Sequence, residues 1–326
     1  MGCQIFFVLS SFGLCYSFSK EIPSWFSHMK RRISKLAIGY WGAILIHVIY
    51  RILVAIIFKK DIITAINIPG VIINTLFLNG FVPIGGINNT IVRGGWYVGT
   101  TVILYALFPL LYKIYFQSKN KAWKKYRTVI FSLAVFFITS TIVILAEFIH
   151  PSFTCGNNSF IYFSFVNQLT PFALGLILFD MSNRYHNTKH ALLVSVTFWI
   201  IAIVLFFGNY HYSFVFCPSF VAAGFVFLYW YLLNNESFYN AIHKGSNILV
   251  RTVSAFGKIS FSIYLTHSFI VYEFSSVCMR FLRPVYNNDL LWYILLLPFQ
   301  FCFTYLVAHI YDKCTAYIKF KKRTAE

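Results

Sequence analysis

Acidic side chains are scarce in this 326-residue chain, which has 9 Asp and Glu against 27 Lys and Arg. Charged residues make up only 11% of the sequence, whereas a soluble domain has about a quarter. Hydrophobic residues reach 59%. This balance excludes an ordinary soluble protein, and we interpret the chain as an integral membrane protein.

Two further features are missing. The first apolar run has neither a basic flank before it nor a small-residue cleavage site after it, so it lacks the arrangement of a secretory signal. The seven cysteines include no C-x-x-C pair and no zinc-site spacing, so we predict no metal site. An external disulfide from Cys155 to Cys217 or Cys278 is one reading of these cysteines, and the alternative is that they are scattered small apolar side chains.

No soluble domain, repeat or linker interrupts the sequence, which predicts one membrane domain over 1–326.

Apolar segments of roughly 20 residues recur along the whole chain, and each is long enough to cross a hydrocarbon core about 30 Å thick. They predict an all-α, polytopic transmembrane helix bundle. The nine expected spans are 3–19, 36–58, 94–116, 128–149, 160–180, 190–207, 213–233, 258–280 and 290–312. The stretch 61–80 is interrupted by Pro69 and Gly70, so we expect it to be re-entrant or interfacial.

The basic residues follow the alternation of these spans. Most of the 27 fall in loops that alternation places on one side, and the bias of Lys and Arg toward the cytoplasm makes that side internal. These loops are 20–35, 113–127, 181–189, 234–258 and the basic tail 313–326. The net charge of +18 is thereby explained without a nucleic-acid partner, and none is expected. The C-terminus is predicted to be cytoplasmic, and an odd number of spans leaves Met1 outside.

Two segments carry charge or ionisable groups at helical spacing. In "HMKRRISKLAIGYW" at 28–41, Arg32 and Lys35 are three residues apart and share one helix face, suited to an anionic ligand in the cytoplasm. The alternative is that they only anchor the helix end. In "FGKISFSIYLTHSFIVY" at 256–272, Ser260, Tyr264 and His267 form one stripe. His267 near mid-membrane could position a hydroxyl or relay a proton, or it could be a structural histidine bonded to a neighbouring helix.

Three other segments have patterned polar or aromatic residues. The chain opens with "GCQIFFVLSSF" at 2–12. In "WYVGTTVILYALFPLL" at 96–111, Trp96, Tyr105 and Pro109 are spaced by nine and four residues. Trp and Tyr at the outer end of a span could contact a ligand, or they could only anchor the helix at the membrane interface. In "VNQLTPFALGLILF" at 166–179, Asn167 and Gln168 stand at the outer start of a span and could bond a sugar or cap the helix. His47 and Arg51 share one face and indicate a polar path within a span.

Together these segments resemble acyltransferase family 3, integral membrane proteins that move acetyl or other acyl groups onto cell-surface glycans and related acceptors. The opening is similar to G-x-D-x-F-F-V-L-S-G-F, with Gln4 for Asp and Ser11 for Gly. The segment 28–41 resembles the family's R-x-x-R, and 96–111 resembles W-x8-Y-x3-P. The segment 166–179 resembles N-Q-L-P-x-F-x-x-G, and 256–272 resembles G-x-I-S-Y-x-I-Y-L-x-H. The family's acidic residue between the Trp and the Pro is absent, since Thr101 and Val102 stand there.

The resemblance implies transfer of an acyl group, expected to be acetyl, from cytoplasmic acyl-CoA to a glycan hydroxyl, with acetyl-CoA as a substrate and no bound cofactor. It implies a catalytic role for His267. Donor phosphates would be held by Arg31, Arg32 and Lys35. The acceptor path would use Trp96, Tyr105, Asn167, Gln168, Ser260 and Tyr264. Expected partners are membrane lipids, the glycan acceptor and polysaccharide-biosynthesis proteins, with a location in the plasma or inner membrane.

The family's first span, whose histidine is implied to act in acyl transfer, has no counterpart before residue 2. We therefore expect a ten-span architecture without its first span; an inactive chain at this length is an alternative to an active acyltransferase. A transporter or glycan flippase is an alternative, as is a non-catalytic subunit of a polysaccharide export complex. Transporters often have two similar halves with matched broken helices, but only one broken segment is evident here.

Overall fold

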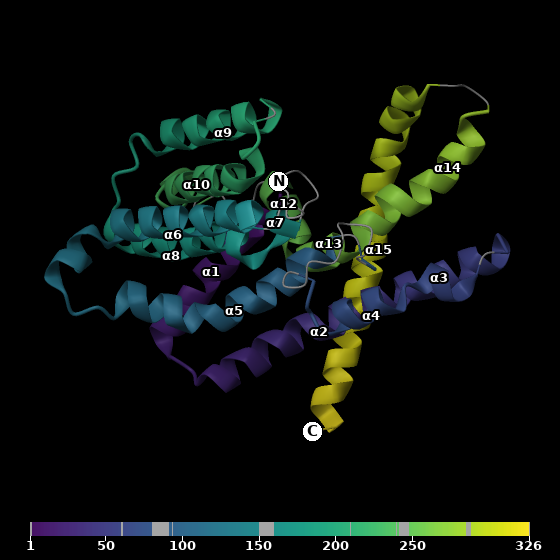
Figure 1. The fold of residues 1–326 in the computed structure, drawn as a ribbon, viewed down its shortest axis with the longest axis horizontal. Coiled ribbons are helices and arrows are strands. Elements are labelled where there is room, and N and C mark those ends of the chain that lie inside the picture. Colours follow the sequence, from purple (N-terminus) through teal and green to yellow (C-terminus); the bar gives the residue numbers. More distant parts are fainter. Residues whose placement is uncertain are drawn as a thin grey trace. The chain divides into compact units, whose positions relative to one another are not determined.

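The computed structural model describes residues 2–59, 61–79, 91–92, 94–149, 160–208, 210–238, 240, 248–284 and 288–325 (Figure 1). These residues form helices and no strand, so the all-α prediction is confirmed for them. The chain divides into two compact units. Unit 1 comprises Met1–Arg32, Leu78–Gly86 and Gly99–Lys244, and unit 2 comprises Ile33–Phe77, Ile87–Val98 and Gly245–Glu326. Helices α2 and α5 each contribute residues to both units.

Unit 1 is organised around one central helix, α8 (Phe165–Arg184), which packs against α1, α6 and α10. The apolar window that includes α8 is 78% buried, against 22% for the more apolar α6, so α8 is enclosed by protein whereas α6 exposes most of its side chains. Ser164 caps the start of α8, since its Oγ accepts from the main-chain nitrogen of Asn167 at 3.3 Å. The other helices of this unit are α1 (Cys3–Lys20), α5 (Gly95–Phe116), α6 (Lys121–Ile149), α7 (Phe160–Phe163), α9 (Ala191–Phe207) and α10 (Ser213–Leu233).

Unit 2 contains most of α2 (Trp25–Ile57) together with the C-terminal helices. Helix α13 packs against α15, and the Ser262 hydroxyl donates to Asp312 Oδ1 at 2.9 Å between them. Helix α15 continues to Ala325, so the described part of the predicted basic tail extends this helix. The elements are α3 (Ile62–Ile66), α4 (Ile68–Thr75), α12 (Ile248–Lys258), α13 (Ser260–Ser268), the π-helical η2 (Phe269–Phe274), α14 (Ser275–Leu282) and α15 (Asp289–Ala325).

Among the residues that the structure describes, six helices are long and apolar enough to cross a membrane, so the predicted count of nine is not confirmed. They are Trp25–Ile57, Gly95–Phe116, Lys121–Ile149, Ile161–Arg184, Ser213–Leu233 and Asp289–Ile318. Helix α9 has only 17 residues, and α1 has 18. The predicted span 258–280 is helical from Ser260 onward but not one regular α-helix, because a turn at Ile259 precedes α13 and the helix passes through η2 before α14.

The apolar stretch 61–80 is broken, as predicted, but at a different residue. The break is at Asn67, whose φ of +53° ends α3, while Pro69 lies in the first turn of α4, where a missing N–H costs no helical bond. Two hydrogen bonds tie α4 to α2 within unit 2: Tyr40 donates to Asn74 at 2.6 Å and the Trp41 indole donates to the Thr75 carbonyl at 3.0 Å. Helix α4 is therefore held by its C-terminal turn.

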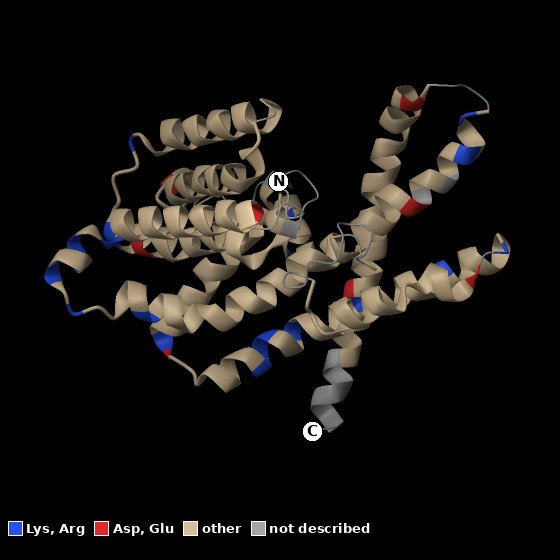
Figure 2. Ribbon diagram, in the orientation of Figure 1, with Lys and Arg blue, Asp and Glu red and all other residues tan. Residues whose placement is uncertain are grey.

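The cations of unit 1 gather at one end of its helices. Figure 2 shows Lys and Arg at the α1–α2, α5–α6 and α8–α9 connections and at the start of α2. Large apolar side chains on the sides of α6 and α9 are exposed, among them Phe137, Ile138 and Ile200. A helical surface that is apolar along its length and basic at one end agrees with three loops on a single side of a membrane.

Candidate functional site

The predicted stripe of Ser260, Tyr264 and His267 lies on one regular helix, α13, in unit 2. Nδ1 of His267 is 2.7 Å from the Tyr264 carbonyl oxygen. A carbonyl can only accept, so we assign the proton to Nδ1, which leaves the lone pair of the neutral ring on Nε2. No described residue bonds Nε2, and the side chain is half-buried. His267 thus has the tautomer and the accessible nitrogen that a general base requires.

The Tyr264 hydroxyl reaches the start of α5. It donates to the Gly94 carbonyl at 2.5 Å, and the Tyr264 ring meets the Tyr97 ring edge-on at 5.1 Å between centroids. Gly94 has a φ of +85°, and a Cβ there would lie 2.8 Å from the hydroxyl oxygen. Trp96 follows two residues later and is buried. The structure therefore brings Trp96, Tyr264 and His267 into one unit, although two segments far apart in the sequence supply them.

The predicted donor-binding residues differ from one another in their surroundings. Arg31 is exposed at the start of α2, and its Nη2 donates to the Ser17 hydroxyl of α1 at 3.3 Å. Arg32 is half-buried, with its guanidinium carbon 5.8 Å from the Tyr105 ring centroid. Lys35 is exposed on the same helix and belongs to unit 2. Arg32, predicted to bind the acyl donor, and Tyr105, predicted to bind the acceptor, are therefore in contact.

His28 is a residue whose role the sequence did not reveal. It is completely buried, and its Nε2 is 3.1 Å from the Tyr105 carbonyl oxygen. In a helix this carbonyl would accept from the residue four positions later, but that residue is Pro109, which has no N–H. The imidazole supplies the missing donor. Beside it, the Trp25 indole donates to the Ala106 carbonyl at 3.1 Å, so the first turn of α2 is docked on α5.

Asn167 and Gln168 are buried and bonded to the protein itself. Asn167 Nδ2 donates to the Phe214 carbonyl at 3.1 Å, which Pro218 has likewise deprived of its helical donor. Gln168 Nε2 donates to the Tyr162 carbonyl at 2.7 Å, and Gln4 donates to Gln168 Oε1 at 3.2 Å. A contact between these amides and an acceptor sugar stays a prediction, and it requires these internal bonds to open.

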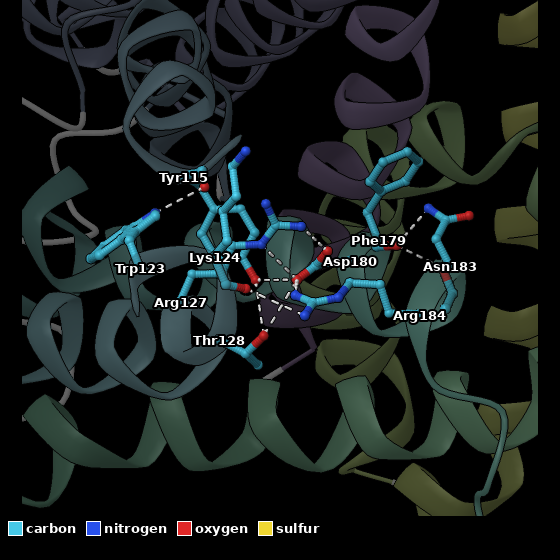
Figure 3. A network of polar contacts seen from close by, with 10 residues as sticks. Tyr115, Trp123, Lys124, Arg127, Thr128, Phe179, Asp180, Asn183 and Arg184 are labelled. Atoms are coloured by element: carbon cyan, nitrogen blue, oxygen red, sulfur yellow. Dashed lines mark hydrogen bonds and ion pairs between the residues drawn. The ribbon is translucent and has the colours of Figure 1, made fainter. Parts of the chain in front are cut away.

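A second feature that the sequence did not reveal is the carboxylate of Asp180, which is only 2% exposed at the basic end of unit 1 (Figure 3). Arg127 contacts both of its oxygens, and Arg184 donates to Oδ2 at 3.0 Å. The hydroxyls of Tyr115 and Thr128 donate to the same oxygen at 3.0 and 3.4 Å. The carboxylate joins α5, α6 and α8. Its signal in the sequence is an acidic residue at the end of an apolar run.

The predicted polar path of unit 2 includes a residue from η2. His47 Nδ1 donates to the Ala43 carbonyl at 2.9 Å, and its ring meets Phe269 edge-on at 5.6 Å. The charges of Arg51 and Glu273 both act on this histidine. Glu273 therefore belongs with His47 and Arg51, and nothing in the helical spacing of α2 could have shown it.

The described residues contain no group of three or more His, Cys, Asp and Glu placed to hold a metal ion. Of the cysteines in the predicted disulfides, Cys155 lies outside the described residues. The Cys217 thiol donates to the Ala202 carbonyl at 3.4 Å, so it packs as a small buried side chain within unit 1.

Comparison with protein families covers nearly the whole chain. The model of a family described as an acyltransferase domain matches residues 1–309, which include all five sequence motifs. The chain belongs to acyltransferase family 3. Comparison with curated proteins and with solved structures gives no match. Membership in acyltransferase family 3, together with the six long apolar helices, makes the chain a multi-pass membrane protein with the domain of an acyl-group transferase.

Proposed function

We propose that the protein transfers an acetyl group from acetyl-CoA to a hydroxyl of a cell-surface polysaccharide or glycolipid. Its place would be the plasma or inner membrane, with the basic end of unit 1 and the C-terminus in the cytoplasm. The observation that carries the proposal is His267, which lies within the segment matched by the family model and has Nδ1 bonded to its own helix and Nε2 left accessible. The same arrangement is not required of a transporter.

The residues of unit 2 supply the chemistry in this proposal. Nε2 of His267 takes the proton of the acceptor hydroxyl while that oxygen attacks the thioester carbonyl carbon. The carbonyl oxygen becomes an oxyanion; it then re-forms the C=O bond, the C–S bond breaks, and the CoA sulfur takes the proton from the imidazolium. The bond from Nδ1 to the Tyr264 carbonyl holds the ring through both transfers. The products are an acetyl ester and CoA, and the histidine returns to its neutral form.

The cations at the start of α2 supply donor binding. Arg31 is the exposed one of the two arginines, and a phosphate can reach its guanidinium without displacing a buried contact. Lys35, also exposed, adds a second positive charge on α2 but as a point charge rather than a planar fork. Arg32 is half-enclosed against Tyr105 and suits a different part of the donor.

The test uses purified protein in lipid nanodiscs with radiolabelled acetyl-CoA and membrane glycolipid or polysaccharide as acceptor. His267→Asn is the informative variant, because an Asn amide can still donate to the Tyr264 carbonyl but cannot act as a base. We expect its transfer rate to fall by about 10²–10⁴-fold, the usual contribution of general base catalysis.

The matched control is His309→Asn, which changes an exposed histidine of α15 in the same unit. Its transfer rate should equal that of the wild type. If His267→Asn keeps the wild-type rate, His267 is not the base. If the wild-type protein releases no CoA and labels no acceptor, the proposed function itself is wrong.

A further inference from the structure

His28, which is buried, and Arg32, which is half-buried, form a pair of polar groups to which the proposed chemistry gives no step. They are four residues apart on α2 and therefore share one helix face. His28 is completely buried, and its Nε2 is occupied by the Tyr105 carbonyl. Since a carbonyl can only accept, Nε2 carries the proton and Nδ1 of the neutral ring carries the lone pair.

Each member of the pair has one enclosed atom without a hydrogen-bond partner among the described residues. These atoms are Nδ1 of His28, an acceptor, and Nε of Arg32, a donor. The charge of Arg32 acts directly on His28, so the two groups are neighbours in space as well as on the helix. Buried polar atoms are nearly always paired in folded proteins, and two complementary ones side by side mark a place for a group that both donates and accepts.

The surroundings restrict what that group can be. Phe18 meets the His28 ring edge-on at 5.1 Å between centroids, and Phe108 stacks on it at 6.3 Å. These walls are apolar and favour a neutral ligand with aliphatic parts. A phosphate dianion offers acceptors only, so its oxygens would face the lone pair of Nδ1. The half-buried guanidinium of Arg32 places the site next to the surface where Arg31 is exposed.

We propose that His28 and Arg32 bind the pantetheine arm of the acyl-CoA donor. The arm carries two secondary amides and a hydroxyl on an aliphatic chain, and each of these groups can donate and accept. In this arrangement Arg32 Nε–H donates to an amide or hydroxyl oxygen of the arm. His28 Nδ1 accepts a hydrogen bond from an amide N–H or the hydroxyl O–H of the arm. Arg31 is left to the phosphates. The inference rests on the proposed function, since it names a part of the same donor, and it makes His28 a binding residue.

The test compares two probes, CoA and adenosine 3′,5′-bisphosphate, which has phosphates but no pantetheine arm. Affinities are measured by calorimetry in nanodiscs. His28→Gln keeps an amide that can donate to the Tyr105 carbonyl but removes the ring lone pair. We expect it to bind CoA about tenfold more weakly, the loss of one hydrogen bond, and to bind the bisphosphate as the wild type does. Arg31→Ala should weaken both probes.

A second variant keeps the test decisive if His28→Gln folds poorly. Arg32→Lys retains the positive charge but removes Nε–H, and it should show the same selective loss for CoA. If both variants bind CoA as tightly as the wild type, or lose both probes equally, the pantetheine assignment is overturned and the pair serves packing or a buried water. If the wild type binds neither probe, the acyl-CoA donor of the proposed function fails as well, which is a different result.

Discussion

A Cβ atom on Gly175 of α8 would lie 2.4 Å from the main-chain oxygen of Val8 on α1. The two helices of unit 1 therefore cross with their backbones in contact, as small residues allow in membrane bundles. Ser11 is the nearest side chain at this crossing, with its Cβ 2.6 Å from the same point, and it stands where the family has glycine. The close approach holds the first motif against the central helix.

Gly175→Ala should destabilise unit 1, because the added methyl group forces α1 away from α8. We expect a loss of about 1–3 kcal/mol, the usual cost of overpacking, seen as a lower midpoint of thermal unfolding in detergent. Gly13→Ala is the control, since a Cβ at Gly13 meets nothing within 4 Å. Equal midpoints for the two variants would mean that the crossing can open freely.

Asp180→Asn should be strongly destabilising, because it leaves Arg127, only 13% exposed, without its carboxylate. Breaking a buried pair in this way costs about 3–5 kcal/mol. Asp289→Asn removes a partner from the exposed pair with Arg283, where both side chains are 57% exposed, and should leave the unfolding midpoint almost unchanged because solvent screens this pair. Thermal unfolding of both variants checks the difference, and a mild effect of Asp180→Asn would contradict a structural role for this network.

Gly94 and Tyr264 should be energetically coupled. Gly94→Ala strains a positive φ and presses a methyl group on the Tyr264 hydroxyl, whereas Tyr264→Phe loses one hydrogen bond, about 1 kcal/mol. Tyr264→Phe also removes the oxygen that the methyl group would meet. The double variant should therefore unfold at a higher temperature than the sum of the two single effects predicts. Strict additivity in this cycle would show that the contact carries no energy.

Asn167→Ala should destabilise unit 1 by about 1–2 kcal/mol, because the Phe214 carbonyl then has no donor. Pro218→Ala restores the helical N–H that this carbonyl lacks. In the Pro218→Ala background the further change of Asn167 should cost clearly less, and unfolding midpoints of the four proteins measure the difference. The same cost in both backgrounds would mean that Asn167 acts through some other contact.

The sequence supports the helical class and the His267 stripe because both depend on local information. Apolar content and run length are sums over neighbours in the chain, and a spacing of four and three residues defines one helix face. The predicted span 258–280 shows the limit of this approach. Hydropathy averages over a window and cannot detect a break at Ile259 or a change to π-helical hydrogen bonding.

The contacts of His28 could not be predicted because its partner is 77 residues away. Pro109 does reveal that the Tyr105 carbonyl lacks a helical donor, but not which side chain replaces it. The same holds for Asn167, predicted to face an acceptor sugar and found bonded to the Phe214 carbonyl. In each case the sequence identifies an unsatisfied acceptor, and packing selects the donor.

The π-helical segment η2 begins two residues after His267, and at its end the Ser275 hydroxyl donates to the Ile270 carbonyl at 3.1 Å. An α-helix turns by about 100° per residue, and the wider turns of η2 take up extra residues without that rotation. Arg280 therefore stands at a different angle from the one that an uninterrupted α-helix counted from His267 would give it. The same residues in a purely α-helical segment would direct Arg280 to another side of its helix, so the backbone form of η2 sets the angular offset between these two side chains.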